Sequence, residues 1–276
     1  MRRIDEVLSR PIPIGVPTAP PATSASSSSD AVLLNRHRKE KDAVLLNRHR
    51  KEKDAECSLC GGLGWVRLEV PYGHAEFGQA RPCPCGLVAR RRLQRIDAVF
   101  GFTPQLQAES FATLIPIEGS EEAIEATHHY VAHPSGWLYL WGPVGDGKTK
   151  LLAIAINALR ASGYEAVFCV VPELLSYLRA TFEPDSPVRF DETFDYLKSA
   201  PLLGLDDLGA ESPSPWVNEL LYELFGWRYR AELPTIVTSN ARPELIRDPR
   251  LASRLRDVRL CTVAYCGRTD VRQLCR

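Results

Sequence analysis

The chain has 276 residues, 45% of them hydrophobic, and its 34 Lys and Arg balance its 34 Asp and Glu, so the formal net charge is zero. This length suffices for one full domain and a smaller one, and the charge balance excludes a polycation, so nucleic acid could be contacted only through a local basic patch. The sequence has no apolar run of about eighteen residues and no apolar signal segment at its start, and we expect a cytoplasmic protein without a membrane span.

The first 54 residues are predicted to form a disordered tail. Residues 1–30 combine a short basic opening with a stretch rich in proline, alanine and serine, which cannot bury enough apolar surface to fold. The sequence AVLLNRHRKEKD then occurs twice, at Ala31–Asp42 and Ala43–Asp54. Twelve residues advance about 1200° around a helix, so the two apolar patches lie about 120° apart and form no continuous stripe. The repeat is interpreted as a solvated spacer or as a basic arm that contacts nucleic acid.

Four cysteines form two close pairs after the repeat. Cys57 and Cys60 are separated by twenty-two residues from Cys83 and Cys85, and glycine follows each pair. With a strand hairpin expected between them, two such thiolate pairs suit a tetrahedral Zn²⁺ site, and four sulfur ligands leave no open position for chemistry. We therefore expect a docking or scaffolding module. A disulfide pair, unligated thiols, or His74 in place of one sulfur are the alternatives.

Three segments lead from the cysteines into the main domain. Leu87–Ile96 is predicted to be a short helix with several arginines, which either face phosphate or form the solvated side of a linking helix. Gly101–Leu114 is expected to be an entry loop, and Glu121–His133 a helix.

A phosphate-binding loop is the strongest motif in the sequence. The segment GPVGDGKT fits the pattern G-x-x-x-x-G-K-[ST], with an apolar strand expected over Trp137–Trp141 and a helix that begins by Leu151 and ends near Gly163. In this context backbone N–H groups and the helix N-terminus cradle a nucleoside triphosphate, while the lysine reaches its β- and γ-phosphates and the threonine ligates Mg²⁺. The predicted nucleotide site comprises Gly142, Pro143, Val144, Gly145, Asp146, Gly147, Lys148 and Thr149.

Strands and helices alternate after this loop, which indicates an α/β fold with a parallel sheet. The amphipathic helix over Trp216–Arg230 is expected to place Leu220, Leu221, Leu224, Phe225 and Trp227 in the core. The other predicted elements are a strand over Ala166–Val170, a helix from Pro172, a helix over Phe190–Ser199, a strand over 202–208, a strand over Pro234–Asn240 and a basic helix over Leu251–Arg256.

Two strand ends carry polar groups suited to nucleotide hydrolysis. Asp206 is expected to ligate Mg²⁺ through water, and Asp207 to orient and deprotonate the attacking water. Asn240, at the end of a further strand, can sense the γ-phosphate and position this water. Arg254, or another arginine of the basic helix, could reach the nucleotide of an adjacent subunit as a trans-acting finger. The alternative for the two acids is a solvated strand end.

These motifs carry a family resemblance. The segments GPVGDGKT, LLGLDDLGA, PTIVTSN and RLASRL resemble the AAA+ ATPases of the DnaC/DnaI/IstB group, over about 111–272. The resemblance makes Lys148 and Thr149 Walker A, Asp206 and Asp207 Walker B, and Asn240 sensor 1, with the arginine finger in SRL. The closing segment Gly267–Arg272 is similar to the group's G-x-D-Y-R, with valine in place of the aromatic residue.

The resemblance implies a helicase loader of bacterial or phage DNA replication, because CxxCGG…CPC is similar to the N-terminal module of DnaI-type and phage loaders. Its expected ligands are ATP, Mg²⁺ and Zn²⁺, and its expected partners are a replicative helicase, single-stranded DNA and further copies of itself, assembled through Arg254. An IstB-like transposition helper, an ATP-binding adaptor with little turnover, and a nucleotide kinase are the alternatives. The expected organisation is a tail over 1–54, a zinc module and basic linker helix over 55–100, and the ATPase domain over 101–276.

Overall fold

The computed structural model describes residues 57–116, 118–182 and 189–267. The tail, the tandem repeat and Arg272 lie outside the described residues. The described chain separates into two compact units, one that ends at Arg95 and one that begins at Ile96. This division falls within one helix, α3 (Leu87–Val99), a few residues before the predicted boundary at residue 100.

The first unit is a small module built around the cysteines. Its antiparallel hairpin pairs β1 (Trp65–Arg67) with β2 (Ala80–Pro82), so the expected hairpin is present, although its strands have only three residues each. Cys60, Val66 and Cys83 form its buried cluster. Within this unit, the hydrogen bond from Cys83 N–H to Gly64 O (2.7 Å) joins the second cysteine pair to the loop after the first.

The second unit contains a five-stranded parallel sheet with the order β4-β5-β6-β3-β7. The strand that precedes the phosphate-binding loop, β3, therefore lies between β6 and β7, and β6 separates it from β5, which carries the two acids. The strands are β3 (Trp137–Trp141), β4 (Ala166–Val170), β5 (Leu202–Leu208), β6 (Thr235–Ser239) and β7 (Cys261–Tyr265).

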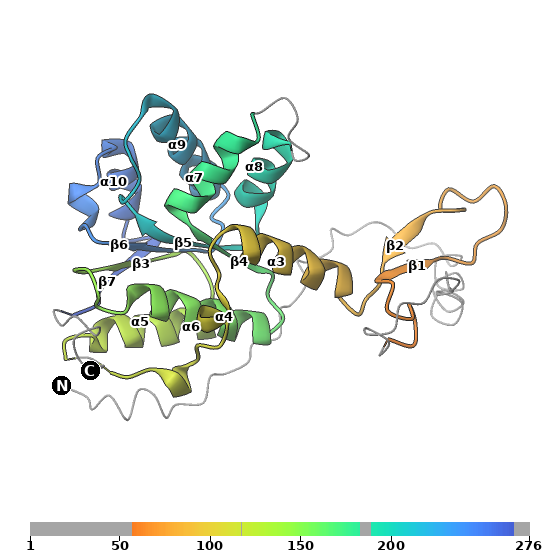
Figure 1. Cartoon of the computed structure of the whole chain (residues 1–276), viewed down its shortest axis with the longest axis horizontal. Coiled ribbons are helices and arrows are strands. Elements are labelled where there is room, and N and C mark those ends of the chain that lie inside the picture. Colours follow the sequence, from red (N-terminus) through yellow and green to blue (C-terminus); the bar gives the residue numbers. More distant parts are fainter. Residues whose placement is uncertain (1–56, 117, 183–188, 268–276) are drawn as a thin grey trace, which may run out of the picture. The chain divides into compact units, whose positions relative to one another are not determined.

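Helices cover both faces of this sheet. Figure 1 shows α5 and α6 beneath the sheet and α7, α9 and α10 above it. Among the described residues, no helix combines the length and the apolar character needed to cross a bilayer. The helices of this unit are α4 (Pro104–Gln107), α5 (Glu121–Ala132), α6 (Lys148–Ala161), α7 (Val171–Ala180), α8 (Phe190–Ser199), α9 (Pro215–Arg230) and α10 (Pro249–Leu255), with short 3₁₀ helices at Phe111–Thr113 and Pro243–Leu245.

The apolar strands explain this layered fold. Almost every residue of β3, β4, β5 and β6 is buried, as expected for strands that have helices on both faces. Parallel neighbours also require crossover connections, which the helices provide. Gly204 of β5 lets α6 approach closely, because a Cβ at this position would lie 2.8 Å from Leu152 Cδ1. The three-layer α/β architecture with a parallel sheet was therefore correctly predicted.

One local prediction was wrong, and one strand was not predicted. The segment Gly101–Leu114, expected to be a loop, contains α4 and the first 3₁₀ helix, and Thr103 caps α4 by accepting a hydrogen bond from Leu106 N–H. Phe102 at its start is buried and stacks on Phe168 of β4 with ring centroids 4.6 Å apart. The strand that was not predicted is the edge strand β7, whose Thr262 is exposed and interrupts the apolar pattern.

The predicted core face of α9 also needs correction. Trp227 is 47% exposed, whereas the next residue, Arg228, is fully buried. Burial lowers the pKa of Arg228 to about 10, and its hydrogen bonds go to neutral oxygens. These acceptors are Leu197 O (3.1 Å), Lys198 O (3.2 Å), Ala200 O (2.8 Å), Pro234 O (2.6 Å) and Thr235 Oγ1 (2.9 Å). Arg228 thus joins α9 to the end of α8, to Ala200 just after it, and to the start of β6.

Candidate functional site

The GPVGDGKT loop connects β3 to α6 at the carboxyl edge of the sheet. Gly145 and Gly147 have φ angles of 88° and 86°, a region that glycine adopts without steric cost. Gly147 is the N-cap of α6, and Lys148 and Thr149 are its first two residues. The loop therefore has the conformation and the helix N-terminus that suit phosphate binding.

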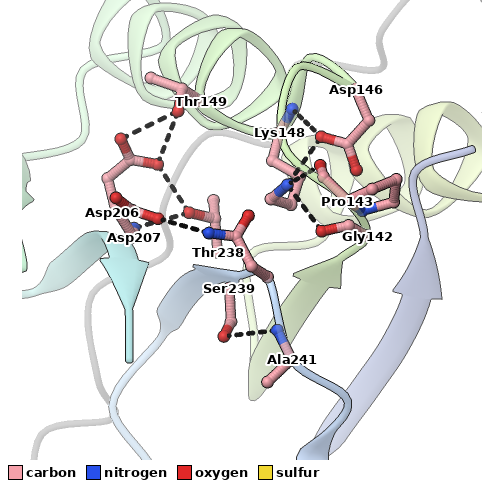
Figure 2. A network of polar contacts seen from close by, with 11 residues as sticks. Gly142, Pro143, Asp146, Lys148, Thr149, Asp206, Asp207, Thr238, Ser239 and Ala241 are labelled. Carbon is pink, nitrogen blue, oxygen red and sulfur yellow. Dashed lines mark hydrogen bonds and ion pairs between the residues drawn. The ribbon is translucent and has the colours of Figure 1, made fainter. Parts of the chain in front are cut away.

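Asp206 joins two neighbouring elements at this edge (Figure 2). Thr149 Oγ1 donates to its carboxylate, with distances of 3.0 and 3.1 Å to the two oxygens. Thr238 Oγ1 of β6 donates to Asp206 Oδ1 at 2.6 Å. Burial raises the pKa of Asp206, and the hydrogen bonds from Thr238 and Thr149 oppose this shift. The structure thus places Asp206 beside Thr149, with Thr238 as a second support.

Asp207 turns away from regular strand geometry beside this pair. Its φ of 61° lies in the left-handed region, which non-glycine residues adopt rarely and mostly where neighbouring contacts fix them. Its N–H donates to Thr238 Oγ1 (2.9 Å), and its Oδ1 accepts a hydrogen bond from Asn240 Nδ2 (3.2 Å). The predicted water-activating acid and the predicted phosphate sensor therefore lie side by side.

Lys148 is held inside the loop by an ion pair. Its Nζ lies 2.8 Å from Asp146 Oδ1, and it also donates to Gly142 O (2.9 Å) and Pro143 O (2.7 Å). Both members of the pair are buried, and burial raises the pKa of Asp146 while the contacts with Lys148 lower it. Val144, at the tip of the loop, is exposed.

Arg254 lies on α10, outside the network of Figure 2. Its guanidinium is 4.7 Å from the ring centroid of Tyr222 and 5.6 Å from that of Tyr229, and it donates to Tyr222 O at 3.4 Å. Within this chain the predicted finger therefore rests against aromatic rings, half-buried. A contact with the nucleotide of another subunit remains a prediction.

The donor set at the sheet edge fits a magnesium–nucleotide complex. The Asp206 carboxylate and the Thr149 hydroxyl, which touch in the structure, are hard oxygen ligands of the kind that Mg²⁺ prefers. The loop adds backbone N–H groups and the buried ammonium of Lys148. These residues can hold Mg²⁺ and the phosphates of a nucleoside triphosphate together.

The four cysteines form a second candidate site, a metal centre. The Sγ atoms of Cys57, Cys60, Cys83 and Cys85 all lie within 4.8 Å of one another, and His74 is not in this group. The distances Cys57–Cys83 and Cys60–Cys85 are both 3.7 Å. Zn–S bonds of about 2.3 Å give a tetrahedral S···S edge of about 3.8 Å. The described cysteines form no disulfide, so the geometry fits a tetrahedral zinc ion and not the disulfide alternative.

Backbone groups around the sulfur of Cys60 favour its thiolate form. Burial would raise the pKa of Cys60, but hydrogen bonds from the backbone of Gly64 and Gly62 outweigh it, with contributions from the Cys57 and Cys85 thiols, and lower the pKa to about 6. A thiolate is the form that binds metal. Gly62 and Gly64, which follow the first cysteine pair, therefore direct backbone N–H groups at the Cys60 sulfur.

Sequence reasoning missed Thr238, which contacts both acids. No motif identifies it, because Thr238 lies two residues before Asn240 in a strand that reads as uniformly buried. Its role depends on the position of β6 between β3 and β5, and the order of strands in a parallel sheet is not encoded in any local pattern. The one signal in the sequence was that Thr238 has a hydroxyl group within an apolar strand, because a buried hydroxyl requires a hydrogen-bond partner.

Comparisons with known proteins identify relatives among helicase loaders and ATP-binding proteins of insertion sequences. No family model matches the chain. The replicative helicase loader DnaI of Bacillus subtilis is 34% identical over 111 residues, which are 40% of this chain and 35% of that protein. The loader DnaC of Escherichia coli K12 is 24% identical over 157 residues (55% and 64%), and an insertion-sequence ATP-binding protein of Sinorhizobium fredii is 30% identical over 158 residues (55% and 50%). The chain thus spans between a third and two thirds of the length of these relatives.

The solved structure of DnaI agrees with these relatives. It matches this chain with a TM-score of 0.51 and 29% sequence identity, and the match covers 59% of this chain and 94% of the DnaI structure. Together, the five-stranded sheet and the loop with its facing acids define a P-loop domain of the AAA+ type. The chain is similar to the AAA+ proteins of the DnaC/DnaI/IstB group, and a four-cysteine module precedes its P-loop domain.

Proposed function

We propose that this chain is an ATPase that loads a replicative helicase onto single-stranded DNA. The observation that carries the ATPase part is the contact between Thr149 and Asp206, with Asp207 and Asn240 beside it, at the edge where the phosphate-binding loop begins. The similarity of this chain to DnaI and DnaC, both replicative helicase loaders, supports the proposal that it loads a helicase.

The residues of the site have distinct roles in this proposal. Lys148 and the N–H groups of its loop hold the β- and γ-phosphates, and Thr149 and Asp206 hold Mg²⁺. The metal supplies positive charge that offsets the charge of the phosphates. Asp207 orients the attacking water and accepts its proton, and Asn240, hydrogen-bonded to Asp207 at 3.2 Å, fixes the direction of this carboxylate.

Arg254 completes the site of a neighbouring copy. An arginine supplied in trans stabilises charge in the transition state of phosphoryl transfer. Arg254 must leave the rings of Tyr222 and Tyr229 to do so, which makes its release a step of subunit assembly. ATP hydrolysis would then depend on a ring or filament of subunits.

The cysteine module serves as a docking unit in this proposal. Cys57, Cys60, Cys83 and Cys85 bind one Zn²⁺ and leave no position free for a substrate. The proposed organisation is a tail over 1–54, this module with its linker helix over 55–100, and the ATPase domain over 101–276.

A mixing experiment tests the ATPase and its dependence on assembly. We expect Arg254→Ala and Asp207→Asn each to lower single-stranded-DNA-stimulated ATP hydrolysis by about a thousandfold. Mixed together, the two variants should regain part of the activity, because some interfaces then combine an intact acid with an intact arginine. Arg256→Ala, an exposed arginine just after α10, is the matched control. Hydrolysis that is unaffected by Arg254→Ala and by single-stranded DNA would contradict the proposal.

Partner capture separates loading from transposition. The similarity to the insertion-sequence ATP-binding protein favours an IstB-like transposition helper as the second candidate. Pull-down from the native host with ATP bound should recover a hexameric helicase if the chain is a loader, and a transposase if it is a helper. An ATP-binding adaptor would recover a partner yet show little turnover.

A further inference from the structure

Asp146 occupies an unusual place in the phosphate-binding loop. It lies between two glycines with positive φ, so the backbone turns its carboxylate inward, and only 1% of the residue is exposed. A loop that binds phosphate concentrates N–H donors and positive charge at its centre. Asp146 therefore places a carboxylate next to the positive charge on which a phosphate group would depend.

The hydrogen bonds of Lys148 show what this carboxylate does. An ammonium group has three N–H donors and no acceptor. In the structure these donors are taken by Gly142 O, Pro143 O and Asp146 Oδ1, at 2.9, 2.7 and 2.8 Å. Lys148 Nζ thus has no donor left for a phosphate oxygen until one of these acceptors leaves.

Asp146 is the acceptor best suited to leave. The two carbonyls belong to the loop backbone, whereas Asp146 is held through a side chain (Figure 2). Its second oxygen, Oδ2, is buried and has no hydrogen-bond partner among the described residues, and it packs so closely against Gly142 that an added Cβ there would collide with it. A buried carboxylate oxygen without a partner is unfavourable, so the inward position of Asp146 is stabilised mainly through Lys148.

We propose that Asp146 is an internal competitor for Lys148, which a nucleotide phosphate must displace in order to bind. The inference rests on the proposed function, since it assumes that the nucleotide binds in this loop. Asp146 weakens nucleotide binding in two ways: it occupies one donor of Lys148, and its negative charge repels the incoming phosphates. The return of Asp146 to Lys148 also favours release, so the residue sets nucleotide affinity and exchange.

Equilibrium binding of ADP and ATP, measured by calorimetry on the full chain, tests this inference. We expect Asp146→Asn, which removes the charge but keeps the size, to tighten binding of both nucleotides roughly tenfold or more. Asp146→Ala, which also vacates the Lys148 contact, should tighten it at least as much. Asp191→Asn, which removes an exposed carboxylate from α8, is the matched control and should leave affinity unchanged.

The outcomes separate the inference from the proposed function. Unchanged or weaker binding in both Asp146 variants, with thermal unfolding showing a folded core, would overturn the inference and make Asp146 neutral or a preorganising residue. Lys148→Met tests the proposed function. If this variant bound nucleotide as well as the unaltered chain, the loop would not be the nucleotide site.

Discussion

The two units of this chain differ in what can hold them together. The unit from Ile96 onward buries a large apolar cluster between its sheet and helices, with residues such as Leu138, Leu152 and Phe168 fully inaccessible. In the cysteine module, by contrast, the buried cluster of the described residues consists of Val66 and two cysteines, and Trp65 is 42% exposed. A module of this size cannot fold by apolar burial alone. We therefore propose that a metal ion takes the place of apolar packing in the cysteine module, while packing suffices in the other unit.

Removing the metal should give the largest effect. Structural zinc contributes about 10–16 kcal/mol to small zinc-binding peptides, as much as the whole stability of a typical domain (about 5–15 kcal/mol). We expect Cys57→Ser and Cys83→Ser to abolish zinc binding and hydrogen-exchange protection over 57–86, while the melting temperature of the sheet unit stays unchanged.

Ser58→Ala, an exposed change between two of the cysteines, is the control for this experiment. Zinc content should be measured together with hydrogen-exchange protection, because both are expected to depend on the same four sulfurs. Unaltered metal content in the cysteine variants would show that the module folds by other means.

Arg228 tests how far packing alone explains the second unit. Arg228→Met keeps the aliphatic part of the side chain but removes the guanidinium, so that several buried carbonyl oxygens lose their donor. Unsatisfied groups of this kind cost about 1–3 kcal/mol each. We expect a loss of about 3 kcal/mol or more in the free energy of unfolding, measured by denaturant titration. Arg230→Met, an exposed change at the last residue of α9, should stay within about 0.5 kcal/mol. Equal stability of the two variants would reduce Arg228 to a packing residue.

Arg228 and Trp227 also mark the limit of prediction from sequence. Helical periodicity correctly placed Leu220, Leu221 and Leu224 in the core, because apolar residues at this spacing face one side. It could not choose between a tryptophan and an arginine at the end of the stripe, since the buried position is set by carbonyls that come from α8 and β6. The hydrogen-bond acceptors available at this position, and not the polarity of the side chain, therefore decide that Arg228 is buried and Trp227 is exposed.

The candidate site shows the same division. The continuous apolar strands and the rule that ligands gather at their carboxyl ends were enough to predict that Thr149 and Asp206 would lie close together. The ion pair of Asp146 with Lys148 could not be predicted, because a motif that accepts any residue at this position carries no information about its side chain. Thr238 required knowledge of the strand order.

Thr238 gives the smallest and most specific test. Thr238→Val removes the hydroxyl that donates to Asp206 (2.6 Å) and accepts from Asp207 N–H (2.9 Å), with almost no change in volume. We expect ATP hydrolysis to fall roughly 10- to 100-fold, equivalent to about 1.4–2.7 kcal/mol, with nucleotide affinity changed much less, because the hydroxyl orients the acids and does not hold phosphate.

Two further variants separate positioning from a general loss of stability. Thr238→Ser retains the hydroxyl and should restore most of the hydrolysis, although it removes a buried methyl group. Thr262→Val makes the same substitution on an exposed position of β7 and should leave kcat unaltered. If Thr238→Ser were as impaired as Thr238→Val, the methyl group and not the hydroxyl would matter. The dependence of the sheet unit on packing would then extend to the edge that carries Asp206 and Asp207, where the structure instead indicates control by polar contacts.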